Sequence, residues 1–122
     1  MLKLLVVDDE AEICDFLKDF FEQRHFKVNT AMSGEDALRK IESEQPDICL
    51  LDIKLPGMDG MQVLKEIKRK YPRIKTIMVT ALETTEKIQE AVRMGADNYI
   101  TKPLSLEYLE TDVRDKLESL AK

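Results

Sequence analysis

The sequence predicts an α/β fold in which five parallel strands form a doubly wound sheet with helices on both faces. Short apolar or β-branched runs alternate with segments of helical period, and this alternation is typical of βαβ units. The runs at 4–7 and 48–51 are continuously apolar, as expected of central strands buried on both faces. The run at 26–31 instead alternates, which indicates an edge strand. Together these patterns favour the flavodoxin-like strand order 2-1-3-4-5.

The five predicted strands end at successive points along the chain, and polar residues directly follow the first, third, fourth and fifth of them. Their last apolar residues are Val7, Ala31, Leu51, Val79 and Ile100. In the predicted order the first and third strands are neighbours, and the topological switch point lies between them. A ligand is therefore expected outside the carboxyl ends of these two strands.

Five helices are predicted between and after the strands, and several of their ends carry recognisable signals. Ser33–Asp36 has the pattern of a capping box, and Asp59 is a plausible N-cap after the turn at 56–60. Gly95 is a natural end for the fourth helix, and the last helix starts at Ser105. The side chains expected to face the sheet are Ile13, Phe16, Leu17, Phe20, Phe21, Ala37, Leu38, Ile41, Val63, Leu64, Ile67, Ile88, Ala91, Val92, Leu106, Leu109, Val113, Leu117 and Leu120.

Composition and charge narrow the class of protein. The 122 residues are 43% hydrophobic and 35% charged, which suits one globular domain spanning 1–122. A net charge of −5 argues against direct binding of nucleic acid or of an anionic membrane. The N-terminus does not resemble a signal peptide, and no apolar stretch is long enough to cross a membrane. Cys14 and Cys49 form no CxxC motif, so buried thiols in a reducing, cytoplasmic setting are expected.

An acidic cluster is predicted at the switch point. The residues that follow the first, third, fourth and fifth strands are Asp8, Asp9 and Glu10, then Asp52, then Thr80, then Lys102. Two carboxylates about 4 Å apart repel by roughly 4 kcal/mol at an effective dielectric of 20. Raised pKa values, the Lys102 ammonium or a divalent cation would offset this repulsion, and Mg²⁺ with oxygen ligands fits best. Taken alone, Asp9 would more simply be the N-cap of a D-x-x-E helix start.

Four motifs at these positions together resemble a known family. They are the pair Asp8–Asp9, Asp52 within LLDIKLPGMDG, Thr80–Ala81, and GADNYITKP with Tyr99 and Lys102. Over residues 2–120 the chain resembles the receiver domain of two-component response regulators. The resemblance implies a phosphoacceptor that catalyses only its own phosphoryl transfer and dephosphorylation, rather than an enzyme acting on separate substrates.

The resemblance also assigns a role to each acidic position. Asp52 would accept a phosphoryl group from the histidine of a sensor histidine kinase or phosphotransfer protein. Asp9, Asp52 and the backbone carbonyl of Lys54 would ligate Mg²⁺ (or Mn²⁺), and Asp8 would act on the ion through water. Phosphoryl transfer asks a protein mainly for positioning and charge neutralisation, which such a set supplies.

The remaining implied roles concern phosphoryl binding and output. Thr80 and Lys102 would bind phosphoryl oxygens, and the Lys102–Pro103 bond would be cis. Inward movement of Thr80, followed by Tyr99, would change the surface made by helix 4, strand 5 and helix 5. A downstream effector or output domain would read that surface, and a weak homodimer is left open.

Some positions depart from the pattern of winged-helix regulators in this family. Asn98, Tyr108 and Asp112 stand where those regulators carry the acids and the arginine of their symmetric dimer, so that dimer is not expected. Lys54 and Leu82 lie where the family tunes the lifetime of the phosphoryl group, and they predict no particular lifetime.

Three other functions fit the sequence less well. An FMN-binding flavodoxin would need a phosphate loop where the acids stand after the first strand. A phosphatase of the haloacid dehalogenase type would carry Asp-x-Asp there, in place of Asp8–Asp9–Glu10. A pseudo-receiver that acts only as an interaction module would not need the full set of acids, Thr80 and Lys102. The single histidine, His25, is interpreted as structural.

Overall fold

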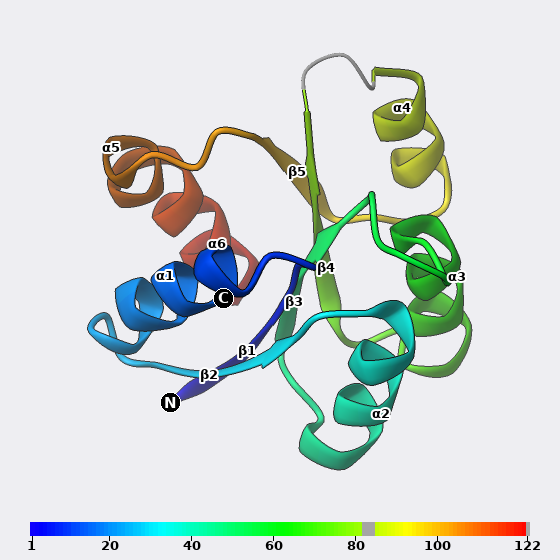
Figure 1. Cartoon of the computed structure of the whole chain (residues 1–122), viewed down its shortest axis with the longest axis horizontal. Helices are drawn as coiled ribbons and strands as arrows, with labels where there is room; N and C mark the ends of the chain where they lie inside the picture. Colours follow the sequence, from blue (N-terminus) through cyan, green and yellow to red (C-terminus); the bar gives the residue numbers. More distant parts are fainter. Residues whose placement is uncertain (82–84, 122) are drawn as a thin grey trace.

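The computed structural model describes residues 1–81 and 85–121 and shows a five-stranded parallel sheet in the order β2-β1-β3-β4-β5. Helices cover both faces: α1 and the C-terminal helix lie on one side, and α2, α3 and α4 on the other (Figure 1). The predicted fold class and strand order are confirmed. In the part of the chain that is described, no helix is long and apolar enough to span a membrane.

The elements follow one another in strict alternation. The strands are β1 (Leu2–Val7), β2 (Phe26–Ala31), β3 (Ile48–Asp52), β4 (Lys75–Thr80) and β5 (Asn98–Thr101). The helices are α1 (Ala11–Glu22), α2 (Gly34–Glu44), α3 (Gly60–Lys70), α4 (Thr85–Arg93), α5 (Leu106–Tyr108), the π-helical turn η1 (Leu109–Val113) and α6 (Arg114–Ala121).

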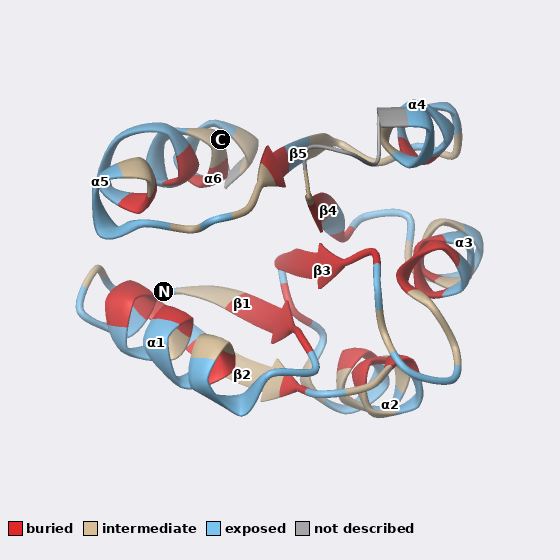
Figure 2. Cartoon of the chain, turned by 45° about the horizontal axis from the view of Figure 1, so that its top comes forward, coloured by how far each residue is buried: buried red, intermediate tan, exposed pale blue. Residues whose placement is uncertain are grey.

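Two apolar cores sandwich the sheet, and the central strands contribute to both. Along β1, Leu4 and Val6 face the helices α1 and α6, whereas Leu5 and Val7 face α2 and α3. Every residue of β3 is buried, which explains its unbroken apolar sequence (Figure 2). Full burial of one such aliphatic side chain contributes about 1.5–3 kcal/mol, so the central strands are held firmly and their ends are fixed in place. Cys14 and Cys49 are both buried free thiols, as predicted.

The helix ends mostly follow their sequence signals, with one correction. The Asp59 carboxylate and the Gln62 side chain exchange 3.0 Å hydrogen bonds with each other's backbone N–H, and Ser33 accepts from the Asp36 N–H. The N-cap of α1 is Glu10, without a side-chain cap, so the interpretation of Asp9 as the N-cap is wrong. The Asp9 carboxylate is thus not used in holding the helix end.

Three side chains expected in the core are exposed, and the last helix is not continuous. Phe16, Val92 and Leu106 are 42%, 53% and 54% exposed. Val92 lies on α4 next to Ala91, which is buried and is the residue that turns toward the core. Leu106 is the first residue of α5 and remains exposed, whereas Leu109, where the π-helical turn begins, is fully buried.

Candidate functional site at the carboxyl edge of the sheet

The ends of β1 and β3 place two carboxylates side by side. The strands β1 and β3 pair up to Val7 and Leu51, so Asp8, which follows β1, and Asp52, the last residue of β3, lie at the same edge of the sheet. The Asp8 N–H extends the pairing to β2 by donating to the Ala31 carbonyl at 3.0 Å. Asp8 is 2% exposed and Asp52 is 5% exposed. Both acids are therefore rigidly held and largely removed from water.

Lys102 provides the cation that balances these two acids. Its Nζ lies 2.8 Å from Asp52 Oδ2 and 3.2 Å from Asp8 Oδ2. The lysine follows β5, where its own N–H donates to the Thr80 carbonyl at 2.8 Å, and the bond to Pro103 is cis. The sequence offered three ways to reduce the repulsion between the acids: raised pKa values, the Lys102 ammonium or a divalent cation. The contacts show the Lys102 ammonium directly.

The pKa values of Asp52 and Lys102 reflect this buried arrangement. Burial raises the pKa of Asp52, and the Asp8 charge adds to the rise, while the Lys102 ammonium and the Lys54 N–H act against it. Burial alone would lower the pKa of Lys102, but the contacts with Asp52 and Asp8 outweigh it, so its pKa is raised. The lysine thus stays charged at neutral pH and holds both carboxylates in place.

The loop after β3 closes tightly behind Asp52. Asp52 Oδ1 accepts a 3.0 Å hydrogen bond from the Lys54 N–H, and the Gly60 N–H donates to the Ile53 carbonyl at 2.9 Å. A Cβ on Gly60 would lie 2.1 Å from the Asp52 carbonyl oxygen, so only glycine fits there. The loop therefore fixes the orientation of the Asp52 carboxylate, whose two oxygens point to separate partners.

A small hollow lies beside these groups, and most of the predicted site residues line it. Its volume is about 230 Å³ and its walls are Asp9, Glu10, Asp52, Ile53, Lys54, Thr80, Ala81 and Lys102. Carboxylate oxygens of Asp8, Asp9 and Glu10 lie within 4.8 Å of one another. These are hard oxygen donors of the kind that Mg²⁺ prefers, so the residues fit such an ion. Glu10 received no role of its own from the sequence, although its position after the first strand, next to Asp8 and Asp9, indicates that it lies at this edge.

The two residues of the predicted switch take different positions. Thr80 ends β4, is 3% exposed and lines the hollow, and its hydroxyl donates to the Ala81 carbonyl at 3.1 Å. Tyr99 lies on the edge strand β5, is 41% exposed and does not line the hollow. Lys116 on α6 donates to the Tyr99 carbonyl at 3.2 Å. Leu82, named for phosphoryl lifetime, lies outside the described residues.

The fold and the acidic edge define a class of signalling domain with a doubly wound sheet, and comparison with known proteins identifies the family. The model of the response regulator receiver domain matches residues 4–114, so the chain belongs to this family. Receiver domains are the signalling domains of two-component response regulators, not enzymes in the ordinary sense.

Solved structures agree with this assignment. A CheY-like receiver domain protein from Methanospirillum hungatei JF-1 is 34% identical, with a TM-score of 0.89 over 99% of this chain and 97% of its own. The receiver domain of NtrX from Brucella abortus is 32% identical, with a TM-score of 0.85 over 95% of this chain and 98% of its own. In a longer NtrX chain, 31% identical with a TM-score of 0.89, this chain covers 28% of the length while 98% of this chain is matched.

Proposed function

We propose that residues 1–122 form one receiver domain that works as a phosphoacceptor switch in the cytoplasm, with Asp52 as the acceptor. The observation that carries the proposal is the position of its carboxylate. Asp52 lies at the end of a central strand, 2.8 Å from the Lys102 ammonium, on the wall of a 230 Å³ hollow shared with other acids. A hollow of this size has room for a phosphoryl group.

In the proposed reaction a carboxylate oxygen of Asp52 attacks the phosphorus of a phosphohistidine on a sensor histidine kinase or phosphotransfer protein. The new O–P bond forms as the P–N bond to the imidazole breaks, and the imidazole leaves and takes a proton from solvent. The Lys54 N–H keeps one oxygen of Asp52 oriented. Lys102 already lies beside Asp52, so it neutralises charge on the phosphoryl oxygens without a large movement.

The acidic residues are proposed to hold Mg²⁺ (or Mn²⁺). Asp9, Asp52 and the Lys54 carbonyl would be its protein ligands, with Asp8 acting through water and Glu10 adding a nearby carboxylate. A bound divalent cation supplies neutralisation of the phosphoryl charge. The exposed position of Asp9, which is not the cap of α1, supports this use of its carboxylate.

The output is proposed to pass through Thr80 and Tyr99 to the surface formed by α4, β5 and the C-terminal helix. Thr80 borders the hollow and would bind a phosphoryl oxygen, and Tyr99 would follow it inward. Phosphorylation would thus bias two populations of this surface, which a downstream effector or output domain reads. The longer NtrX chain supports an output domain as one reader, because its receiver is part of a larger protein.

Intact mass after incubation with Mg²⁺ and acetyl phosphate tests this function. We expect the wild-type chain to gain one phosphoryl group, Asp52→Asn to gain none, and chelation to abolish the gain. Asp15→Asn, an exposed acid on α1, is the matched control and should behave as wild type. If the purified chain gains no phosphoryl group from acetyl phosphate or from a phosphorylated histidine donor, the pseudo-receiver function replaces the proposed one.

A further inference from the structure

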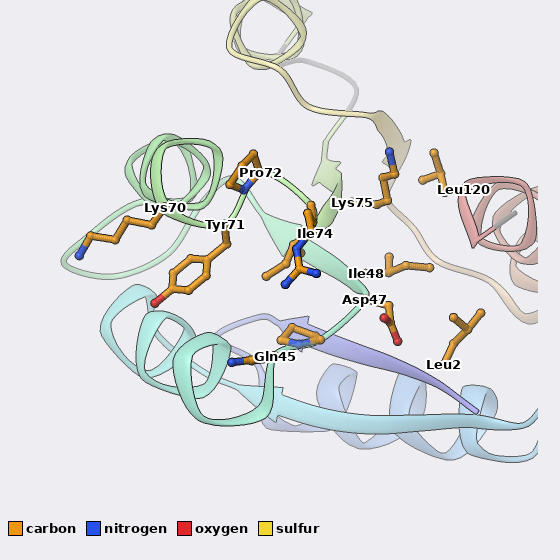
Figure 3. A pocket seen from close by; sticks show the side chains of 12 residues that line it. Leu2, Gln45, Asp47, Ile48, Lys70, Tyr71, Pro72, Ile74, Lys75 and Leu120 are labelled. Atoms are coloured by element: carbon orange, nitrogen blue, oxygen red, sulfur yellow. The ribbon is translucent and has the colours of Figure 1, made fainter.

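A second hollow lies at the opposite, amino edge of the sheet, far from the acidic site. Its volume is about 620 Å³, within the usual range for binding pockets. It lies between the start of β1, the connections α2–β3 and α3–β4, and the end of α6 (Figure 3). None of its wall residues is shared with the hollow beside Asp52.

The floor of this amino-edge hollow is apolar. Ile48 and Ile74 are buried at the strand ends, and Leu2 and Leu120 are half-buried at one side of the opening. In Figure 3 the side chains of Leu2, Ile48 and Leu120 gather on the same side of the hollow. Leu2 and Leu120, which are half-buried, therefore leave apolar surface that side chains of a ligand can cover.

The rim is cationic in a chain that is otherwise acidic. Six of the 19 Lys and Arg residues stand within 65–75 beside one acid, although the whole chain carries −5. Lys70, Arg73 and Lys75 line the hollow and are exposed. Within the described ranges they form no ion pair, whereas Lys68 and Arg69 of the same segment do.

One acid lies among the wall residues, and it is already engaged. The Oδ2 of Asp47 accepts a 2.8 Å hydrogen bond from the Lys3 N–H. The three cations of the rim therefore outnumber the acid, and the field at the opening favours negative ligands.

The spacing of the cations distinguishes between classes of negative ligand. Figure 3 shows Lys70 and Lys75 on opposite sides of the hollow, with their amines pointing away from each other. They do not converge on one point, as the clamping of a single phosphate would require. The net charge of −5 disfavours a nucleic acid. Cations that lie apart around an apolar surface are instead complementary to a polypeptide in which Asp or Glu residues alternate with apolar ones.

We propose that the amino-edge hollow docks an acidic polypeptide segment of a partner protein. Apolar side chains of the segment would cover Leu2 and Leu120, and its Asp or Glu residues would face Arg73 and Lys75. Such a partner would bind the receiver away from the phosphoacceptor. The proposal does not depend on phosphorylation of Asp52.

A displayed library of 12-residue peptides, selected against the full chain at low salt, tests this docking. We expect enrichment of sequences that mix Asp or Glu with Leu, Ile, Val or Phe. Fluorescence anisotropy of the enriched peptides should show a Kd raised about tenfold or more by Arg73→Glu with Lys75→Glu, because two attractions become repulsions. Leu120→Ser should also weaken binding, which a purely electrostatic contact would not predict.

The matched control places the same charge change elsewhere on the surface. Lys65 and Lys87 are exposed and do not line the hollow, so Lys65→Glu with Lys87→Glu should change the Kd less than about threefold. Circular dichroism melting confirms that each variant is folded. The proposal is overturned if no acidic sequences are enriched or if both double variants weaken binding equally. It is also overturned if ATP or a single-stranded oligonucleotide binds this hollow more tightly than the peptides.

Discussion

Replacing Lys102 by methionine removes the one cation among the described residues that forms ion pairs with both buried acids. The substitution keeps most of the side-chain volume but leaves Asp8 and Asp52 without the ammonium at 3.2 and 2.8 Å. The side chains of Asp8 and Asp52 are 3% and 7% exposed, whereas that of Lys102 is 27% exposed. Breaking a buried pair costs about 3–5 kcal/mol, and the partial access of water to the lysine places the expected loss near 3 kcal/mol at pH 7.5.

The loss should depend on pH in a definite direction. Burial and the neighbouring Asp8 charge raise the pKa of Asp52, and loss of Lys102 removes the cation that acts against this rise, so the pKa of Asp52 lies still further above its unfolded value in the variant. The folded variant then binds more protons than the unfolded chain, so its free energy of unfolding falls as pH rises above about 4. The difference from wild type should therefore be small at pH 4 and fully developed at pH 7.5.

Urea denaturation followed by circular dichroism, in the presence of a chelator, measures this difference at both pH values. Arg69→Met is the control, since Arg69 and Glu66 form an exposed ion pair whose loss should leave the free energy of unfolding nearly unchanged. A Lys102→Met variant that loses less than about 1 kcal/mol at pH 7.5, or loses the same amount at pH 4, would refute the electrostatic account of the site.

Three further predictions concern the surroundings of the site. Gly60→Ala should lower the free energy of unfolding by about 2 kcal/mol or more in urea denaturation, because its Cβ would lie 2.1 Å from the Asp52 carbonyl; an unchanged stability would contradict that contact. Burial raises the pKa of Cys49 to about 12, so iodoacetamide should leave its thiol unmodified at pH 8 until urea unfolds the chain, and equal labelling of both states would be inconsistent with this burial. Lys116→Met removes a 3.2 Å bond to the Tyr99 carbonyl and a cation 5.7 Å from its ring, so phosphorylation by acetyl phosphate should speed up by about two- to fivefold; an unchanged rate would remove Lys116 from the switch.

The sheet and its edge were predictable because strands buried on both faces have continuous apolar sequences. Short unbroken apolar runs such as 48–51, set between helical segments, are typical of central parallel strands, and the acids that follow such strands meet at one edge of the sheet. The convergence of Asp8, Asp52 and Lys102 therefore followed from strand order alone. The contacts at 2.8 and 3.2 Å add that Lys102 bridges both acids, which strand order could not specify.

What the sequence did not predict depends on side-chain packing and helical register. The pattern of Leu106 and Leu109 suits one continuous helix, but Leu106 in the first turn is exposed and a π-helical turn interrupts the helix from Leu109. Asp9 satisfied the sequence rule for an N-cap, yet the helix begins one residue later. The hydrogen bond from Lys116 to the Tyr99 carbonyl joins residues 17 positions apart, and no short sequence pattern predicts it.

The measurement that tests the central claim most directly is the location of the phosphoryl group. After incubation with Mg²⁺ and acetyl phosphate, reduction with borohydride converts an aspartyl phosphate to homoserine, and peptide mass spectrometry then finds the altered residue. We predict homoserine at position 52, with Asp8 and Asp9 unchanged. Homoserine at position 8 or 9, or at no position in a chain that has gained a phosphoryl group, would contradict the assignment of Asp52.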